Sequence, residues 1–144
     1  MKRRGLQRLL RVRKLEEQQS RAELESVVGN RDEIGREIAE AKGRQSAEWH
    51  RLISAADEED RSGRAVATIA MEMARMQQMR AEPRLKEMEA EVARTREELL
   101  TRRVRRRQVE AVLEEELRET QKTSERKAQQ TLDDWYGRRT PESR

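Results

Sequence analysis

The chain has no cysteine and no phenylalanine, and only three of its 144 residues are aromatic: Trp49, Trp135 and Tyr136. Without cysteine it forms no disulfide and offers no thiolate to a metal or a substrate. No apolar run approaches the roughly 20 residues that span a bilayer. The basic N-terminal stretch, MKRRGLQRLLRVRK, lacks the continuous apolar segment of a secretory signal. These absences predict a soluble, cytoplasmic protein.

Apolar residues are scarce as well, at 33%, whereas charged residues reach 43% against about 25% in typical soluble domains. This composition does not supply a compact core for a domain of this length. It fits either a disordered chain or long helices that each bury a narrow stripe. The 33 basic and 29 acidic side chains nearly cancel, which disfavours a dedicated nucleic-acid binder.

Heptad spacing favours the helices over disorder. When d is placed at Leu6 and a at Leu10, more than half of these positions are apolar up to residue 55, which is typical of a coiled-coil seam with polar layers. The a positions are Leu10, Glu17, Leu24, Arg31, Ile38, Gln45 and Leu52, and the d positions are Leu6, Arg13, Ser20, Val27, Ile34, Ala41, Glu48 and Ala55.

The stretch DEEDRSG at 57–63 predicts a turn, after which Ser62 is expected to cap a second helix. The seam of that helix is expected at Val66, Ile69, Met73 and Met76, then at Leu85, Met88, Val92, Thr95, Leu99, Arg102, Arg106, Val109, Leu113 and Glu116, weakening at Thr120, Thr123 and Lys127. The pattern slips around Pro83, which predicts a kink or stutter there, or a second helix that begins only after it. Thr140 and Pro141 are expected to end the helix.

Together these segments predict an all-α fold, an antiparallel coiled-coil hairpin of two long helices in one domain, 1–144. Helix one is expected at about 5–57, the loop at about 58–63, helix two at about 64–138 and a loose tail at 139–144. The second helix is the longer by about 30 Å, so its C-terminal end is expected to overhang without a partner in the chain.

The residues that carry enzyme chemistry are missing. The only histidine, His50, has no histidine or cysteine near it, and the glycine patterns that cradle phosphates are absent. The carboxylates alternate with arginine at helical spacing, as they do on a solvated, ion-paired surface. We therefore expect no enzyme activity, cofactor, bound metal or small-molecule substrate.

Methionines and basic residues form the other distinctive groups. Met73 and Met76 are in register with the expected seam, whereas Met71, Met79 and the off-seam Trp49 are candidates for partner contacts. Residues 2–14 hold seven basic side chains and no acid, so this block is able to lie on an anionic membrane or dock into an acidic partner. The arginines of 102–107 radiate around their helix, which is typical of a charged surface rather than of a groove-facing stripe.

Three stretches carry a family resemblance: LQRLLRVRKLEEQQSRAELE at 6–25, the arginine-rich middle of helix two, and ERKAQQTLDDWYGRR at 125–139. With the two-helix layout, they resemble the FliJ family, the central stalk proteins of the flagellar type III export apparatus. The corresponding stalk of injectisomes is similar. In the family the ending leads through an acidic residue to an aromatic residue and a basic tail. The corresponding positions here are Leu132, Asp133, Asp134, Trp135 and Tyr136.

The resemblance implies a non-enzymatic cytoplasmic stalk, peripheral to the inner membrane at the flagellar base through its partners. Those partners are a hexameric export ATPase, a membrane export gate (FlhA) and export chaperones. The implied ATPase-facing end comprises Leu6, Leu10, Arg13, Leu132, Trp135 and Tyr136. The gate-facing tip falls on Trp49, Ile69, Met71, Met73, Met76 and Met79, where the chain departs from the family because Gln45 and methionines replace the usual tyrosine or phenylalanine.

Two functions of other classes stay open from the residues alone. One is a structural coiled coil that homodimerises through the same seam and needs no turn at 57–63. The other is nucleic-acid binding through 102–107, which predicts a steep salt dependence of affinity.

Overall fold

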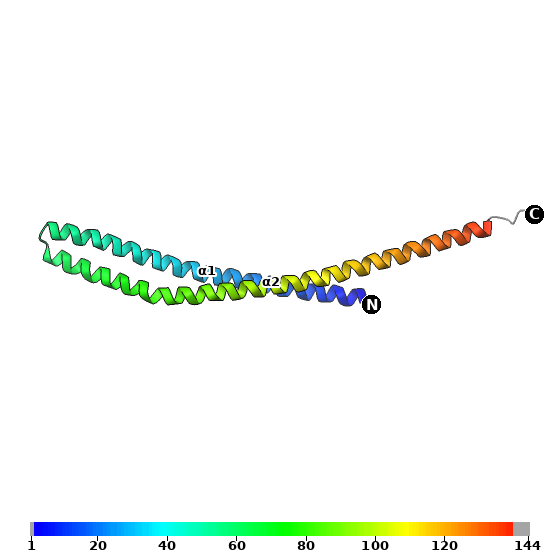
Figure 1. The fold of residues 1–144 in the computed structure, drawn as a ribbon, viewed down its shortest axis with the longest axis horizontal. Helices are drawn as coiled ribbons and strands as arrows, with labels where there is room; N and C mark the ends of the chain where they lie inside the picture. Colours follow the sequence, from blue (N-terminus) through cyan, green and yellow to red (C-terminus); the bar gives the residue numbers. More distant parts are fainter. Residues whose placement is uncertain (1, 140–144) are drawn as a thin grey trace, which may run out of the picture. The chain divides into compact units, whose positions relative to one another are not determined.

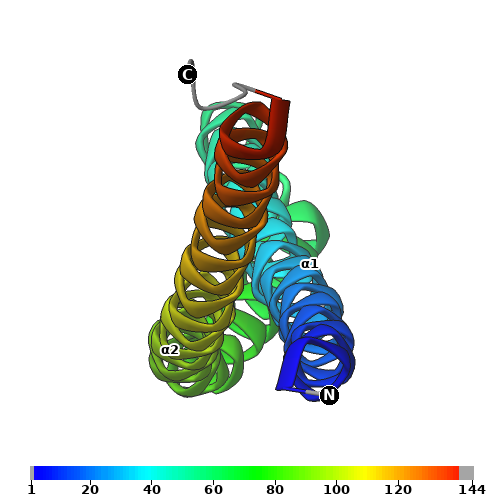
Figure 2. The ribbon, with the colours of Figure 1, turned by 90° about the vertical axis from the view of Figure 1, so that its right-hand side faces the viewer.

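A computed structural model describes residues 2–139 of the chain, and within them it contains two α-helices and no strand. Helix α1 is Lys2–Asp57 and helix α2 is Arg61–Arg139. The two helices are seen along their lengths in Figure 1 and from one end in Figure 2. The predicted all-α hairpin with a longer second helix is confirmed. The predicted stop at Thr140 and Pro141 lies outside the described residues.

The chain divides into two units that are described separately. Residues 19–100 form what we call the loop unit, which contains the turn between the helices. Residues 1–18 and 101–144 form the terminal unit, which pairs the start of α1 with the second half of α2.

Helix α1 ends in a Schellman motif, which closes its last carbonyls within three loop residues. The amide of Asp60 donates to the carbonyl of Ala55 at 2.8 Å, and the amide of Glu59 donates to the carbonyl of Ala56 at 3.3 Å. Glu59 stands at the left-handed position with a φ of 56°, where glycine is the usual residue. The turn is therefore shorter than the predicted loop, because α2 begins already at Arg61.

Asp60 also caps the start of α2, so the prediction of Ser62 as the cap is wrong. Its Oδ1 accepts a hydrogen bond from the amide of Gly63 at 2.9 Å, and its carbonyl accepts one from the amide of Arg64 at 3.1 Å. A Cβ at position 63 would overlap the carboxylate of Asp60, so a larger residue there would require the Asp60 side chain to move. Ser62 lies inside the first turn of α2.

In the loop unit α1 and α2 pack antiparallel. The side chain of Arg44 donates to Gln77 at 2.7 Å, that of Gln45 to Gln78 at 2.6 Å, and Arg84 pairs with Glu37 at 3.3 Å. The best-buried cluster joins Ile34 and Ile38 of α1 to Ala81 of α2, with Leu85 and Met88 packed against it. Every a and d position predicted for α1, in both units, is buried or half-buried.

The seam of α2 begins one residue away from the predicted one, and this is the main correction to the sequence-based fold. Ala67, Ala74 and Ala81 are buried at 1%, 4% and 2% exposure, whereas Val66 and Met73 are 64% and 67% exposed. Burial follows an unbroken 4-3 spacing from Ala67 to Glu116. No stutter occurs at Pro83. The alternative of a second helix that begins only after Pro83 is wrong, because this residue lies within α2. The predicted positions from Leu85 to Glu116 are all buried or half-buried.

In the terminal unit α1 ends its pairing with α2 at Lys2, whose ammonium lies 3.7 Å from the carboxylate of Glu116. Every residue from 117 to 139 is exposed, including the weak seam positions Thr120, Thr123 and Lys127. This part of α2, about 35 Å at 1.5 Å per residue, is the expected overhang and extends past the blue start of α1 in Figure 1.

Candidate functional site

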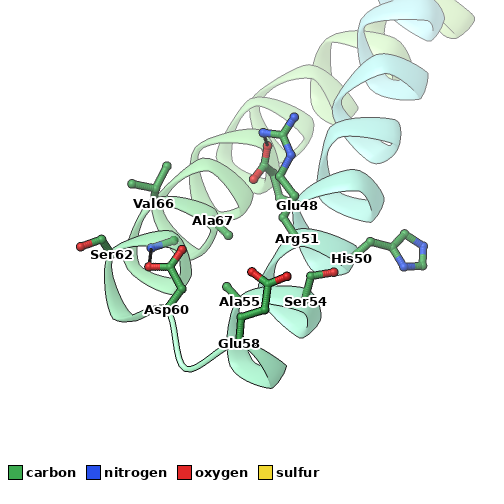
Figure 3. Close-up of a pocket in the computed structure, with 11 residues that line it drawn as sticks. Glu48, His50, Arg51, Ser54, Ala55, Glu58, Asp60, Ser62, Val66 and Ala67 are labelled. Atoms are coloured by element: carbon green, nitrogen blue, oxygen red, sulfur yellow. Dashed lines mark hydrogen bonds and ion pairs between the residues drawn. The ribbon is translucent and has the colours of Figure 1, made fainter.

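Helix α2 has two apolar faces in the loop unit. The inner face is the alanine seam, Ala67, Ala74 and Ala81, which contacts α1. The outer stripe, as we call it, consists of Val66, Ile69, Met73 and Met76, which are exposed at 64%, 62%, 67% and 45%. In Figure 3 Ala67 points toward α1 while the neighbouring Val66 points away from it.

The outer stripe has the geometry of a second coiled-coil seam. Its members are spaced 3-4-3, so they follow one line along the helix. Val66 and Met73 each directly precede a seam alanine, so this line is turned about 100° around the helix from the alanine seam. Nothing among the described residues covers them. Exposed apolar side chains in a contiguous group, rather than singly, mark a surface that binds another protein.

A groove of about 690 Å³ runs beside the outer stripe, between α2 and α1. Met73 and Met76 form one side, and the small residues Ala70 and Ala74 form part of the floor. Arg44 and Glu37 of α1 also line the groove. Arg44 donates a hydrogen bond to Gln77, and Glu37 accepts one from Arg84. A partner helix placed on the stripe would thus find small residues that allow close approach and charged groups at the rim.

The residues predicted to face the gate do not form one surface. Ile69, Met73 and Met76 lie together on the outer stripe, and Met79 is 56% exposed. Trp49 is 52% exposed but belongs to α1, directly after the d position Glu48, and does not line the groove. Met71 is half-buried at a seam position, so the expectation that it faces away from the seam is wrong, as is the placement of Met73 and Met76 in the core.

The terminal unit has a seam that is only partly apolar. Leu6, Leu10 and Arg13, predicted for the ATPase-facing end, are half-buried against α2, and Arg13 pairs with Glu16 at 3.0 Å. Val109, at 9% exposure, is the best-buried apolar side chain contributed to this unit by α2. The three α1 residues therefore make contacts within the terminal unit itself.

A buried carboxylate sits in this seam. Glu17 is 6% exposed and pairs with Arg103 at 3.4 Å and, more closely, with Arg106, which also binds Glu110 at 2.7 Å. Burial alone raises the pKa of Glu17, but the hydrogen bonds and positive charges of Arg106 and Arg103 outweigh it and leave that pKa below 4.5. Hydrogen bonds to Glu17 and Glu110 in turn raise the pKa of Arg106.

The same pairs account for part of the arginine run 102–107. Arg103 and Arg106 bind Glu17, and Arg102 donates to the carbonyl of Glu16 at 3.0 Å. Only Arg105 and Arg107 of the run remain exposed without a described partner. Most arginines of the run therefore bind acceptors on α1 rather than face solvent. This weakens the case for nucleic-acid binding through 102–107.

The aromatic residues of the overhang are exposed. Leu132, Trp135 and Tyr136 are 50%, 47% and 58% exposed, and the two rings meet edge to face with centroids 5.1 Å apart. The guanidinium of Arg139 lies 4.2 Å from the Trp135 ring centre, a cation–π contact within one helical turn. These contacts order the aromatic side chains on the helix while leaving large apolar surfaces open to a partner.

No group of His, Asp and Glu residues between 2 and 139 is arranged to hold a metal ion. A pocket of about 540 Å³ at the turn has His50, Arg51, Glu58 and Asp60 among its lining residues. The imidazole of His50 points away from the turn in Figure 3. Neither helix, over its described length, contains a segment apolar enough to cross a membrane.

Comparison with known proteins adds no assignment to these surfaces. No protein-family model, no curated protein and no solved structure matches the chain.

Proposed function

We propose that the chain is a non-enzymatic central stalk of a type III protein export apparatus. In this role it couples a hexameric export ATPase to a membrane export gate and escorts export chaperones. It is cytoplasmic, and its partners hold it at the inner membrane at the flagellar base. The resemblance of residues 6–25 and 125–139 to the FliJ family motivates the proposal.

The observation that carries the proposal is the outer stripe. A helical hairpin whose second helix keeps alanines inside and leaves Val66, Ile69, Met73 and Met76 outside presents an apolar surface in the loop unit. The terminal unit presents a different surface, the overhang with Leu132, Trp135 and Tyr136. Two separate apolar surfaces suit a protein that links two others.

Gate binding is tested through the outer stripe with the double variant Ile69→Glu/Met73→Glu. Both side chains are exposed, so helicity should stay at the wild-type level while binding of the purified cytoplasmic part of the gate falls at least tenfold. Val104→Glu is the matched control, because Val104 is 52% exposed but lies in the terminal unit. Unchanged gate binding by the double variant would remove the gate from the proposal.

ATPase binding is tested by truncation after Gln130. The deleted residues include Leu132, Trp135 and Tyr136, all exposed, so the melting temperature should stay within about 2 °C of wild type. We expect the truncated chain to lose binding to the ATPase ring and stimulation of its activity. If both survive, the overhang is not the ATPase-facing end.

Homodimerisation through the heptad seam is the weaker alternative, because that seam already joins α1 to α2 within one chain. Sedimentation equilibrium separates the two functions. A monomer at micromolar concentration agrees with the stalk, and a stable dimer contradicts it.

A further inference from the structure

The start of α1 carries a row of arginines on the side that faces away from α2. Arg4, Arg8 and Arg11 are all exposed and, at 100° per residue, lie within about 60° of one another around the helix. The half-buried Leu6 and Leu10 lie on the opposite side, in the seam. The row therefore occupies the outermost line of the terminal unit's α1 segment.

These cations have no partner within the described chain. Arg3 and Lys14 flank the row and are exposed like its three members. Other basic residues of the segment are engaged, since Lys2 pairs with Glu116 and Arg13 with Glu16. Among residues 2–139, no ion pair or hydrogen bond involves the side chains of the row or of the two flanking residues. Residues 2–15 also include no acid that would neutralise these five cations.

Apolar side chains lie in the same face. Leu15 continues the line of Arg4 and Arg8 and is 59% exposed, and Val12 borders the line at 48% exposure. From Arg4 to Leu15 the face is about 16 Å long. The face thus offers several cations together with a small exposed apolar area, and both contribute to binding at a membrane interface.

We propose that this arginine face, Arg3, Arg4, Arg8, Arg11, Lys14 and Leu15, binds the anionic headgroups of a phospholipid surface. The guanidinium groups contact lipid phosphates, and Leu15 and Val12 enter the boundary between headgroups and acyl chains. A lipid surface is favoured over an acidic protein or a nucleic acid because the face points away from α2 and includes apolar residues among its cations. Non-specific binding of nucleic acid depends on the charges and makes no use of exposed leucine or valine.

The charge of the loop unit makes it a poor site of contact with an anionic surface. The loop unit holds 14 basic and 18 acidic side chains, a formal net charge of −4, so it is repelled by an anionic surface. The proposal needs neither the export ATPase nor the gate, and it stands or falls separately from the stalk function.

The test is sedimentation of the full chain with sucrose-loaded vesicles. One set contains phosphatidylglycerol and phosphatidylcholine in equal parts, and the other contains phosphatidylcholine alone. We expect binding only to the anionic set and a loss of binding at high salt, because surface charges are then screened. The triple variant Arg4→Glu/Arg8→Glu/Arg11→Glu should lower the partition coefficient by at least about 100-fold, at roughly fivefold per cation.

The matched control is Arg36→Glu/Lys86→Glu/Arg96→Glu, which makes the same change in net charge with three exposed residues of the loop unit. Its binding should stay within a few-fold of wild type, and circular dichroism should find both variants as helical as wild type. Leu15→Gln should weaken binding without changing its salt dependence. Equal losses in the two triple variants would reduce the effect to net charge and overturn the proposal. So would absence of binding to anionic vesicles, including the case in which a short DNA duplex binds the arginine face instead.

Discussion

The neighbouring residues Met73 and Ala74 are expected to respond in opposite ways to substitution, and this contrast tests the seam of α2. Ala74 is 4% exposed and faces α1. The change Ala74→Met adds bulk between two packed helices, which costs about 1–3 kcal/mol of unfolding free energy when the backbone has to shift. The change Met73→Ala removes a side chain that is 67% exposed and costs less than about 0.5 kcal/mol.

For a chain of this length, 1 kcal/mol corresponds to about 3 °C in melting temperature. Ala74→Met should therefore melt about 3–9 °C below wild type, and Met73→Ala should melt within about 2 °C of it. Thermal unfolding followed by far-ultraviolet circular dichroism measures both. Alanine is also the better helix former, so any small shift for Met73→Ala is expected upward.

The reversed result would refute the assignment of the two faces. If Met73→Ala melted well below wild type while Ala74→Met did not, the seam would contain the methionines and α2 would be rotated by about one residue. The pair Val66→Ala and Ala67→Met provides an independent repeat near the turn, with exposures of 64% and 1%.

The turn and the buried carboxylate give three further expectations. Asp60→Ala should lower the unfolding free energy by about 1 kcal/mol through loss of the cap, whereas Ser62→Ala should be neutral in the same denaturant titration; equal effects would contradict the cap assignment. Glu59→Gly should raise the unfolding free energy by up to about 1 kcal/mol, because glycine adopts a φ of 56° without the Cβ clash; a destabilised variant would mean that no strain is relieved. The pKa of Glu17 is lower in the folded than in the unfolded chain, so its contribution is present above about pH 4.5 and is lost as the pH falls through the lowered pKa. Glu17→Gln should thus lose less stability than wild type as the pH falls below about 4.5, and parallel acid unfolding curves would disprove the role of this carboxylate.

The seam of α1 was predictable because its large apolar residues keep a single heptad register on both sides of the polar layers. Leu24, Val27, Ile34 and Ile38 fix the a and d positions, and even the polar layers at Glu17 and Ser20 fall where the spacing puts them. What the spacing does not reveal is the partner of a polar layer. Glu17 meets Arg103 and Arg106 only because the turn sets which part of α2 lies opposite.

The seam of α2 was misplaced near the turn because two faces of that segment have the same spacing. Val66, Ile69, Met73 and Met76 are the larger residues, and a preference for large apolar side chains selects them. Extending the 4-3 spacing back from Leu85 without a break selects Ala81, Gln78, Ala74, Met71 and Ala67 instead, as the structure does. Continuity of the heptads, rather than residue size, was the informative signal.

The candidate docking surfaces were predictable in part. The exposed aromatic pair of the overhang follows from the length of α2, whereas the outer stripe became visible only after its residues were excluded from the seam. Glu59 belongs to the motif that ends α1, and the next residue, Asp60, caps α2. The sequence does not distinguish these two roles, because both residues belong to a run of four acids at 57–60. Gly63 marks the turn in the sequence, but its role is the space that it leaves for Asp60.

The three-residue connection also sets the order in which contacts between the helices form. Partners near the turn, such as Arg44 and Gln77, are 33 residues apart in the chain, whereas Glu17 and Arg106 are 89 apart. Because loop-closure entropy rises with the length of chain enclosed, pairing begins beside Asp60 and each later contact extends it at little further cost. The amides around Val109 and Leu10 are then the last to be protected from hydrogen exchange during folding. In the native chain they are the first of the paired segments to open.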